Sequence, residues 1–358
     1  MIVGAPGDEP LEARARQVYD SAIVIDTHND LPSKIVDDGY DPDVRHPAGF
    51  AAPVSAHTDL PRLIESGLTA TFLAAFVDAP YSLAEAGASC RRAVHLIDAA
   101  REFVARHPTR MRLATRGADV RQAKEEGMIA VFMAVEGGHA IENSLDRLRD
   151  LYDRGARSMT LTWNNGTEWA GAAIGLYGTN TGGLSRLGRD VVREMNRLGM
   201  LVDLSHVSPA TMHDAIETST DPVIASHSSA RALCDHPRNL SDDQLRAVAS
   251  TGGVVNVNFF SEFLDSAFDP VTGTAAVTLD CLVDHIEHVA LVAGVDHVGI
   301  GSDFDGATAL PSGMEDVTCL KRLAPALMRR GFGEADVAKI LGGNMLRVIE
   351  HVLDRTPG

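Results

Sequence analysis

Several side chains able to bind metal ions or carry protons stand at the ends of short apolar runs. They are His28, Asp30, Glu136, His206, His227 and Asp303, with Asp305 two positions after the last. Imidazoles, an aspartate and a bridging carboxylate suit zinc or a similar divalent ion, and a further histidine completes a site for two metals. Without cations these ionisable groups would repel or desolvate one another. We therefore predict a binuclear metal site, whose shared water becomes a nucleophile and whose nearby carboxylate manages the proton.

The apolar runs that carry these residues have the pattern of buried strands. Most are too short and too β-branched to be helices, and helical patterns lie between them. The eight runs are Ala22–Asp26, Leu68–Val77, Met128–Val135, Ser158–Trp163, Met200–Ser205, Val223–Ser226, Val254–Phe259 and Val298–Gly301. Near-continuous apolar strands separated by helices indicate a parallel sheet buried on both faces. We predict an α/β fold, a single (β/α)8 TIM barrel with its chemistry at the carboxyl ends of the strands.

The remaining sequence predicts one domain over residues 1–358. It contains neither a linker rich in Pro, Gly or Ser nor a Gly-rich phosphate loop after the first run. Residues 1–20 are expected to form an N-terminal helix, and the proline-containing segment 39–61 a long loop over one barrel face. Ser241 and Gln244 have capping-box spacing, and Asp59 precedes a helical pattern that it can cap.

Charge and composition exclude several classes of protein. The 358 residues carry 32 Lys+Arg against 49 Asp+Glu, and the net charge of −17 repels nucleic acids and anionic membrane surfaces. The sequence shows no basic segment followed by an apolar one, the pattern of a signal peptide. No apolar run approaches the roughly 18 residues needed to span a bilayer. The 4 cysteines are widely spaced, as in a reducing compartment. We expect a soluble cytoplasmic protein that binds neither nucleic acid nor membrane.

Five motifs combine these residues with their neighbours in a specific order. They are Asp26-Thr27-His28-Asn29-Asp30-Leu31-Pro32, Glu136-Gly137-Gly138-His139, the segment from Arg193 to His206, Ser226-His227-Ser228-Ser229-Ala230, and Gly299-Ile300-Gly301-Ser302-Asp303-Phe304-Asp305-Gly306. Together they resemble the membrane (renal) dipeptidase family, which belongs to the amidohydrolase superfamily. The similarity extends from about Ile23 to about Arg347, nearly the whole chain.

The resemblance implies a binuclear zinc hydrolase of dipeptides, with tolerance of a D-residue at the C-terminal position, that acts by attack of a metal-bridging hydroxide. By position it assigns His28 and Asp30 to one zinc, His206 and His227 to the other, and Glu136 to both. It assigns Asp303 to proton transfer from the water to the leaving amine. It assigns Arg238 to the carboxylate of the substrate, which a forked guanidinium suits. Because relatives often dimerise, it also implies a homodimer.

Two positions depart from the family pattern and concern the substrate. Trp163 stands where the renal enzyme has a histidine that polarises the scissile carbonyl, and an indole cannot replace an imidazole there. Either Trp163 packs while Asn164 or Asn165 donates to the oxyanion, or the substrate differs. Phe263 stands where the renal enzyme has a substrate-binding tyrosine. The metal ligands are unaffected by these changes.

Three functions stay open on the sequence. The first is a zinc-dependent dipeptidase. The second keeps the metal site but acts on another small amide, such as an N-acyl amino acid or a β-lactam, which Trp163 and Phe263 favour. The third is a binding protein without activity. Asp303 argues against the third, because a binding site needs no unligated proton carrier beside the metals.

Overall fold

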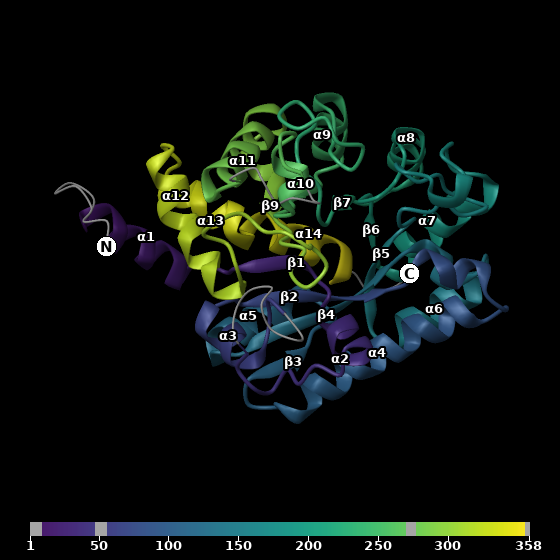
Figure 1. Ribbon diagram of the computed structural model, residues 1–358, viewed down its shortest axis with the longest axis horizontal. Coiled ribbons are helices and arrows are strands. Elements are labelled where there is room, and N and C mark those ends of the chain that lie inside the picture. The colour runs from purple at the N-terminus through teal and green to yellow at the C-terminus, as the bar shows by residue number, and fades with distance from the viewer. Residues whose placement is uncertain (1–8, 47–55, 270–276, 355–358) are drawn as a thin grey trace.

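A sheet of nine parallel strands forms the centre of the molecule (Figure 1). The structure is a computed structural model that describes residues 9–46, 56–269 and 277–354. The strands are β1 (Ile25–Asn29), β2 (Ala70–Phe76), β3 (Met111–Leu113), β4 (Ile129–Glu136), β5 (Ala156–Thr160), β6 (Leu201–Asp203), β7 (Ile224–Ala225), β8 (Val254–Val257) and β9 (Val298–Ile300).

Eight of these strands close into a barrel. Their hydrogen-bonded order is β2-β1-β9-β8-β7-β6-β5-β4, and pairing of β2 with β4 completes the ring. The predicted TIM barrel is therefore confirmed. The ninth strand, β3, pairs with β4 outside the ring and was not predicted, because three residues are too few to reveal a period. β1 begins three residues later than expected, so that His28 lies inside the strand.

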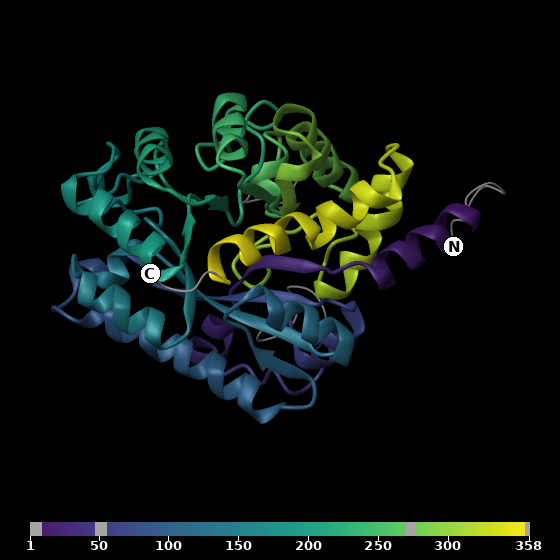
Figure 2. The same cartoon turned by 180° about the vertical axis from the view of Figure 1, so that it is seen from behind.

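Helices surround the barrel, as Figures 1 and 2 show from opposite sides. The α-helices are α1 (Glu9–Ser21), α2 (Leu31–Asp37), α3 (Leu60–Ser66), α4 (Ala88–Arg106), α5 (Gly117–Glu126), α6 (Leu145–Asp153), α7 (Arg186–Leu198), α8 (Pro209–Thr218), α9 (Asp242–Ser250), α10 (Ser261–Leu264), α11 (Leu279–Ala293), α12 (Leu323–Arg329), α13 (Glu334–Ala338) and α14 (Asn344–Leu353). The segment 39–61 includes residues 47–55, which lie outside the described residues.

Local sequence signals explain where several helices begin. The Ser241 hydroxyl accepts a hydrogen bond from the Gln244 amide, and the Gln244 side chain accepts one from the Ser241 amide, so the predicted capping box starts α9. The Asp59 carboxylate accepts a hydrogen bond from the Arg62 amide at 2.8 Å and caps α3, as its position predicted.

Alternate residues of the long strands face the inside and the outside of the barrel. In β4, Phe132 belongs to the apolar cluster inside the barrel, whereas Val131 and Met133 pack in the larger cluster beneath the surrounding helices. The inner cluster includes the first residues of several strands together with α14, which therefore closes the amino end of the barrel. By the same alternation Phe76 and Glu136, which are register partners, face the open carboxyl end.

Two further expectations concern membranes and thiols. Among residues 9–46, 56–269 and 277–354, no helix combines the length and the apolar character that crossing a bilayer requires. All four cysteines are free thiols, in agreement with their wide spacing.

Candidate metal centre and active site

The five predicted metal ligands meet at the carboxyl end of the barrel. His28 lies in β1 and Asp30 directly follows it; Glu136 is the last residue of β4; His206 and His227 follow β6 and β7. None of them is more than 6% exposed. Because the carboxyl ends of parallel strands share one rim, residues far apart in the sequence converge there.

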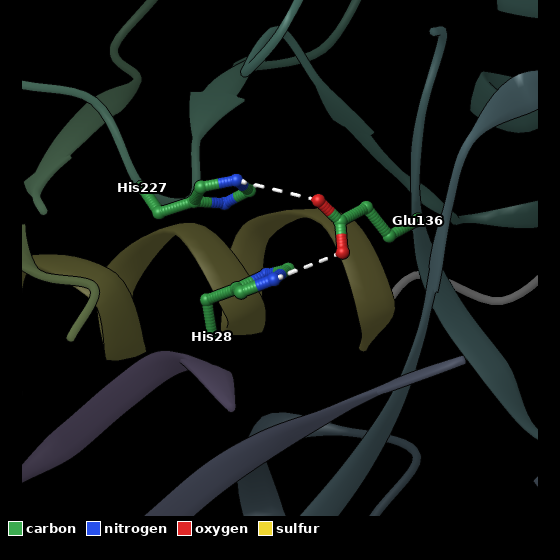
Figure 3. Close-up of side chains that lie close together, drawn as sticks. All are labelled: His28, Glu136 and His227. Carbon is green, nitrogen blue, oxygen red and sulfur yellow. Dashed lines mark ion pairs between the residues drawn. The ribbon is translucent and has the colours of Figure 1, made fainter. Parts of the chain in front are cut away.

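Glu136 points one carboxylate oxygen toward His28 and the other toward His227 (Figure 3). Its Oε2 is 3.2 Å from Nε2 of His28. Its Oε1 is 2.8 Å from Nε2 of His206 and 3.6 Å from Nε2 of His227. His28 Nε2 is also 3.3 Å from Oδ2 of Asp30. The ligand atoms thus form two groups, His28 with Asp30 and His206 with His227, joined by one carboxylate.

The unsatisfied atoms of this cluster fit divalent metal ions. Among the described residues, Nε2 of His28 and Oδ1 of Asp30 are buried without a hydrogen-bond partner. Ligand atoms of His28, Glu136 and His227 lie within 4.8 Å of one another, as do those of His28, Asp30 and Asp303. Buried polar atoms are normally satisfied, and nitrogen and oxygen donors at this spacing suit zinc.

Mutual charges and burial shift the pKa values of these groups. Burial lowers the pKa of His28, but Glu136 and Asp30 outweigh burial and raise that pKa well above its ordinary value. Burial raises the pKa of Asp30 to about 7. Burial also lowers the pKa of His206 to about 3 and that of His227 well below its ordinary value. His206 and His227 are therefore neutral, which is the form of imidazole that binds metals.

Hydrogen bonds orient two of the imidazoles, and one of these bonds fixes which nitrogen of His206 is free. Nδ1 of His206 donates to Oδ1 of Asn164 at 2.9 Å. Nδ1 of His227 lies 2.8 Å from the hydroxyl of Ser226. With its proton on Nδ1, the His206 ring presents an unprotonated Nε2, which lies 2.8 Å from Nε2 of His227. Such contacts orient metal-binding histidines in many proteins.

Two buried aspartates that were missed in the sequence tie the strand ends together. Asp26 accepts hydrogen bonds from the Ser302 amide at 2.8 Å and the Ser302 hydroxyl at 2.6 Å, which joins β1 to the segment after β9. Asp203 accepts from the amides of Ser205 and Ser226, both at 3.0 Å, which joins β6 to β7. Burial raises the pKa of Asp26 to about 6 despite these bonds. The sequence feature that could have revealed both residues is an aspartate at or near the end of an apolar run.

Asp303 stands beside the predicted ligands in a constrained conformation. Its Oδ2 accepts a hydrogen bond from the Asn258 amide nitrogen at 2.9 Å. A Cβ atom at Gly306 would clash with both Asp30 and Asp303, so glycine leaves room beside them. The φ angles of Asp303 and His206 are +63° and +72°, a region that few non-glycine residues adopt.

Arg238 lies in the segment between β7 and α9 and is 3% exposed. Its Nη2 donates to the His227 carbonyl at 3.3 Å, and its guanidinium carbon is 5.5 Å from the centre of the Phe263 ring. Burial lowers the pKa of Arg238 to about 10. Its Nε has no hydrogen-bond partner among the described residues. A buried cation with an open donor is suited to binding an anionic group.

A cavity of about 570 Å³ opens onto these groups. Every predicted site residue except His28 and Asn165 lines it, including Trp163, Asn164 and Phe263. Asn165, the other predicted donor to the oxyanion, is fully buried and is not among the lining residues. Phe76 also lines the cavity and packs edge-on against Trp163, with 4.9 Å between ring centres. Phe76 was missed because it lies within the apolar run Leu68–Val77 and therefore looked like a core residue.

The chain matches a protein-family model and several solved structures. The family model described as membrane dipeptidase (peptidase family M19) matches residues 12–356. A metallopeptidase from Rhodobacter sphaeroides, solved with a phosphinate mimic of the dipeptide L-Ala-D-Ala, is 28% identical; the match covers 93% of this chain and 100% of that one, with a TM-score of 0.81.

Two solved structures from Pseudomonas aeruginosa are also similar. An amidohydrolase is 26% identical over 95% of this chain and 99% of that one, with a TM-score of 0.76. A probable dipeptidase is 24% identical over 98% of this chain and 100% of that one; its TM-score of 0.86 shows a shared fold. With the family model spanning nearly all of the sequence, the chain belongs to the membrane dipeptidase family, peptidase family M19, and is a metal-dependent dipeptidase.

Proposed function

We propose that this dipeptidase is a binuclear zinc enzyme that cleaves the bond next to a free C-terminal carboxylate, with L-Xaa-D-Xaa dipeptides among its substrates. In this proposal His28 and Asp30 would hold one ion, His206 and His227 would hold the other, and Glu136 would serve both. The observation that carries this proposal is the division of the two Glu136 oxygens between His28 and the pair His206 and His227. One carboxylate contacting separate ligand groups is the arrangement expected of a bridge.

Zinc ions bound there supply the positive charge that lowers the pKa of a water molecule and polarises the scissile carbonyl. Asp303 accepts a proton from that water and delivers it to the nitrogen of the leaving amine, while a C–O bond forms and the C–N bond breaks. Support comes from the hydrogen bond that Asn258 gives to Oδ2 of Asp303, which leaves Oδ1 for the proton.

Arg238 binds the carboxylate of the substrate through its guanidinium. Its side chain is buried, and its Nε has no hydrogen-bond partner among the described residues. The ring of Phe263 packs against the face of the guanidinium. Burial strengthens a charge-assisted pair because little water competes with it. Phe263 acts in this proposal by holding Arg238 and not by a hydrogen bond of its own.

Asn164 donates a hydrogen bond to the carbonyl oxygen of the scissile bond. Because its Oδ1 accepts from His206, the Nδ2 group of the same amide is available for donation, and Asn164 lines the cavity. A donor aimed at developing negative charge stabilises the transition state. Trp163 supplies packing beside this amide.

The test is a metal analysis combined with a substrate panel. Zinc-loaded protein should contain one pair of zinc ions per chain and release amino acids from a panel of L,L and L,D dipeptides. N-acyl amino acids and a β-lactam, tested alongside, represent the alternative amide substrates. Turnover of those amides without turnover of dipeptides would refute the proposed substrate, and a single zinc per chain would refute the binuclear centre. A homodimer and a cytoplasmic location stay predictions.

A further inference from the structure

Three of the apolar side chains that line the cavity come from the part of its rim near Glu136 and Asn164, and we call them the apolar wall: Phe76, Trp163 and Ile174. They come from two connections of the barrel, since Phe76 ends β2 whereas Trp163 and Ile174 follow β5. Ile174 is 38% exposed, and Phe76 and Trp163 are partly exposed. Apolar surface left open inside a pocket is surface that an apolar ligand group can cover.

The apolar wall is held in place by the backbone around it. The Ala173 amide donates to the His206 carbonyl at 2.8 Å, which fixes the residue before Ile174 beside the metal centre. The Leu176 amide donates to the Asn164 carbonyl at the same distance. Phe76 and Trp163 pack edge-on, and the Trp163 ring centre is 6.2 Å from that of His206. The wall is therefore a preformed surface next to the groups that act on the scissile bond.

Strand order puts the apolar wall across the barrel mouth from Arg238. In the closed ring, β2 and β5 flank β4, and β4 is four places from β8 in either direction. Phe76 and Trp163 thus stand on either side of Glu136, whereas Phe263 follows β8 and Arg238 lies between β7 and β8. A dipeptide whose carboxylate is at Arg238 and whose scissile bond is beside Glu136 extends its first residue toward the wall.

We infer that the apolar wall binds the side chain of the N-terminal residue and selects dipeptides that begin with a large aliphatic or aromatic residue. This inference rests on the proposed function, because Arg238 sets the direction of the substrate. An aromatic or branched side chain would cover the exposed parts of Ile174 and Trp163, whereas glycine would leave them in water. Edge-on and stacked contacts with the two aromatic rings would favour phenylalanine further.

The experiment compares kcat/KM for Phe-Ala, Leu-Ala and Gly-Ala, with the second residue in the enantiomer that the wild type cleaves. The wild type should prefer Phe-Ala to Gly-Ala by about 10- to 100-fold, the range that one apolar pocket can supply. Trp163→Ala and Ile174→Asp should each reduce the ratio of kcat/KM for Phe-Ala to kcat/KM for Gly-Ala by about 10-fold. Ile174→Leu keeps the apolar surface and should keep the ratio. Leu291→Ala, an exposed apolar residue on α11, is the matched control.

The outcomes separate this inference from the proposed function. If the wild type cleaves dipeptides but Trp163→Ala and Ile174→Asp leave the Phe-Ala to Gly-Ala ratio unchanged, the inference is wrong and the proposed function stands. If the variants instead change the preference between Ala-Phe and Ala-Gly, the wall binds the second residue and the inference is equally wrong. If zinc-loaded wild type cleaves no dipeptide of the panel, both fail. Ile174→Asp provides a test even if Trp163→Ala does not fold, since Ile174 is partly in solvent.

Discussion

The amide oxygen of Asn164 lies 2.9 Å from Nδ1 of His206. This contact fixes two orientations at once. It directs Nε2 of His206 toward Glu136, and it turns the amide so that its Nδ2 group is the part left to donate. One residue thereby connects the orientation of an imidazole with the wall of the substrate cavity.

Two variants of Asn164 should separate these roles. Asn164→Asp keeps an acceptor for His206 but loses the donor, so kcat should fall by about 10²- to 10³-fold with zinc retained. Asn164→Leu loses both groups, so zinc affinity should also fall by about 10- to 100-fold. Zinc titration and dipeptide kinetics measure the two effects. Equal zinc affinity in wild type and Asn164→Leu would show that the contact with His206 does not support metal binding.

Replacement of Asp303 tests the proton carrier. Asp303→Asn keeps the size of the side chain but removes the base, so kcat should fall by about 10²- to 10⁴-fold. Elemental analysis should find the same zinc content as in the wild type. Because Asp303 also lies near His28 and Asp30, loss of one zinc ion in this variant would make Asp303 a ligand instead.

Much of this site could be predicted because strand ends have a clear sequence signal. Glu136 follows a continuous apolar run and precedes two glycines, so its position at the barrel rim followed from the pattern. The roles of Asp203 and Ser226 were harder to predict. A polar residue within or at the end of an apolar run can bind a metal, form hydrogen bonds between neighbouring strands or belong to a turn. Their hydrogen bonds join neighbouring strands, and strand neighbours depend on the closed ring.

Two apolar residues of the site, Phe76 and Ile174, could not be recognised from the sequence. Phe76 continues the alternation of β2, whose earlier inward residue Phe72 is buried inside the barrel. Only the position of Phe76 at the open end, beside Glu136, distinguishes it from a core residue. In the sequence, Ile174 is far from both β5 and β6. Its position in the cavity depends on the hydrogen bond that the Ala173 amide donates to the His206 carbonyl.

The role of Arg238 can be tested with paired substrates. Arg238→Met should lower kcat/KM for a dipeptide by about 10²-fold or more, because charge-assisted hydrogen bonds to the carboxylate are lost. The same dipeptide with its C-terminus amidated has no carboxylate, so wild type and variant should cleave it equally slowly. An equal loss on both substrates would mean that Arg238 supports the fold of the site and not the recognition of the carboxylate.

Removal of the metal should abolish activity and lower the thermal midpoint without unfolding the barrel. A ligand present at about 1,000 times its dissociation constant stabilises the folded state by roughly 4 kcal/mol. The apolar clusters inside and outside the barrel do not include the metal ligands, so the chain should stay folded after dialysis against a chelator. Circular dichroism and a melting curve check both points, and added zinc should restore turnover. Unfolding on chelation would contradict this independence of the core.

An ion-pair cluster far from the metal centre predicts a pH-dependent stability. Glu194 in α7 accepts hydrogen bonds from Arg197 of the same helix and from Nε of Arg149 in α6 at 2.7 Å. The Arg197 guanidinium, with help from Arg149, lowers the pKa of Glu194 from 4.5 to about 2. A lowered pKa in the folded state stabilises the protein above the ordinary pKa, and this contribution is lost as the pH falls from 4.5 toward 2.

Glu194→Gln should therefore destabilise the protein by about 1 to 3 kcal/mol at pH 7. Its difference from the wild type should narrow as the pH falls below about 4.5, where protonation begins to remove the wild-type charge. Urea unfolding at several pH values measures this difference. Asp146→Asn is the matched control, because Asp146 also contacts Arg149 but its side chain is 90% exposed. A Glu194→Gln deficit that stays constant with pH would show that packing, and not the charge of Glu194, joins α6 to α7.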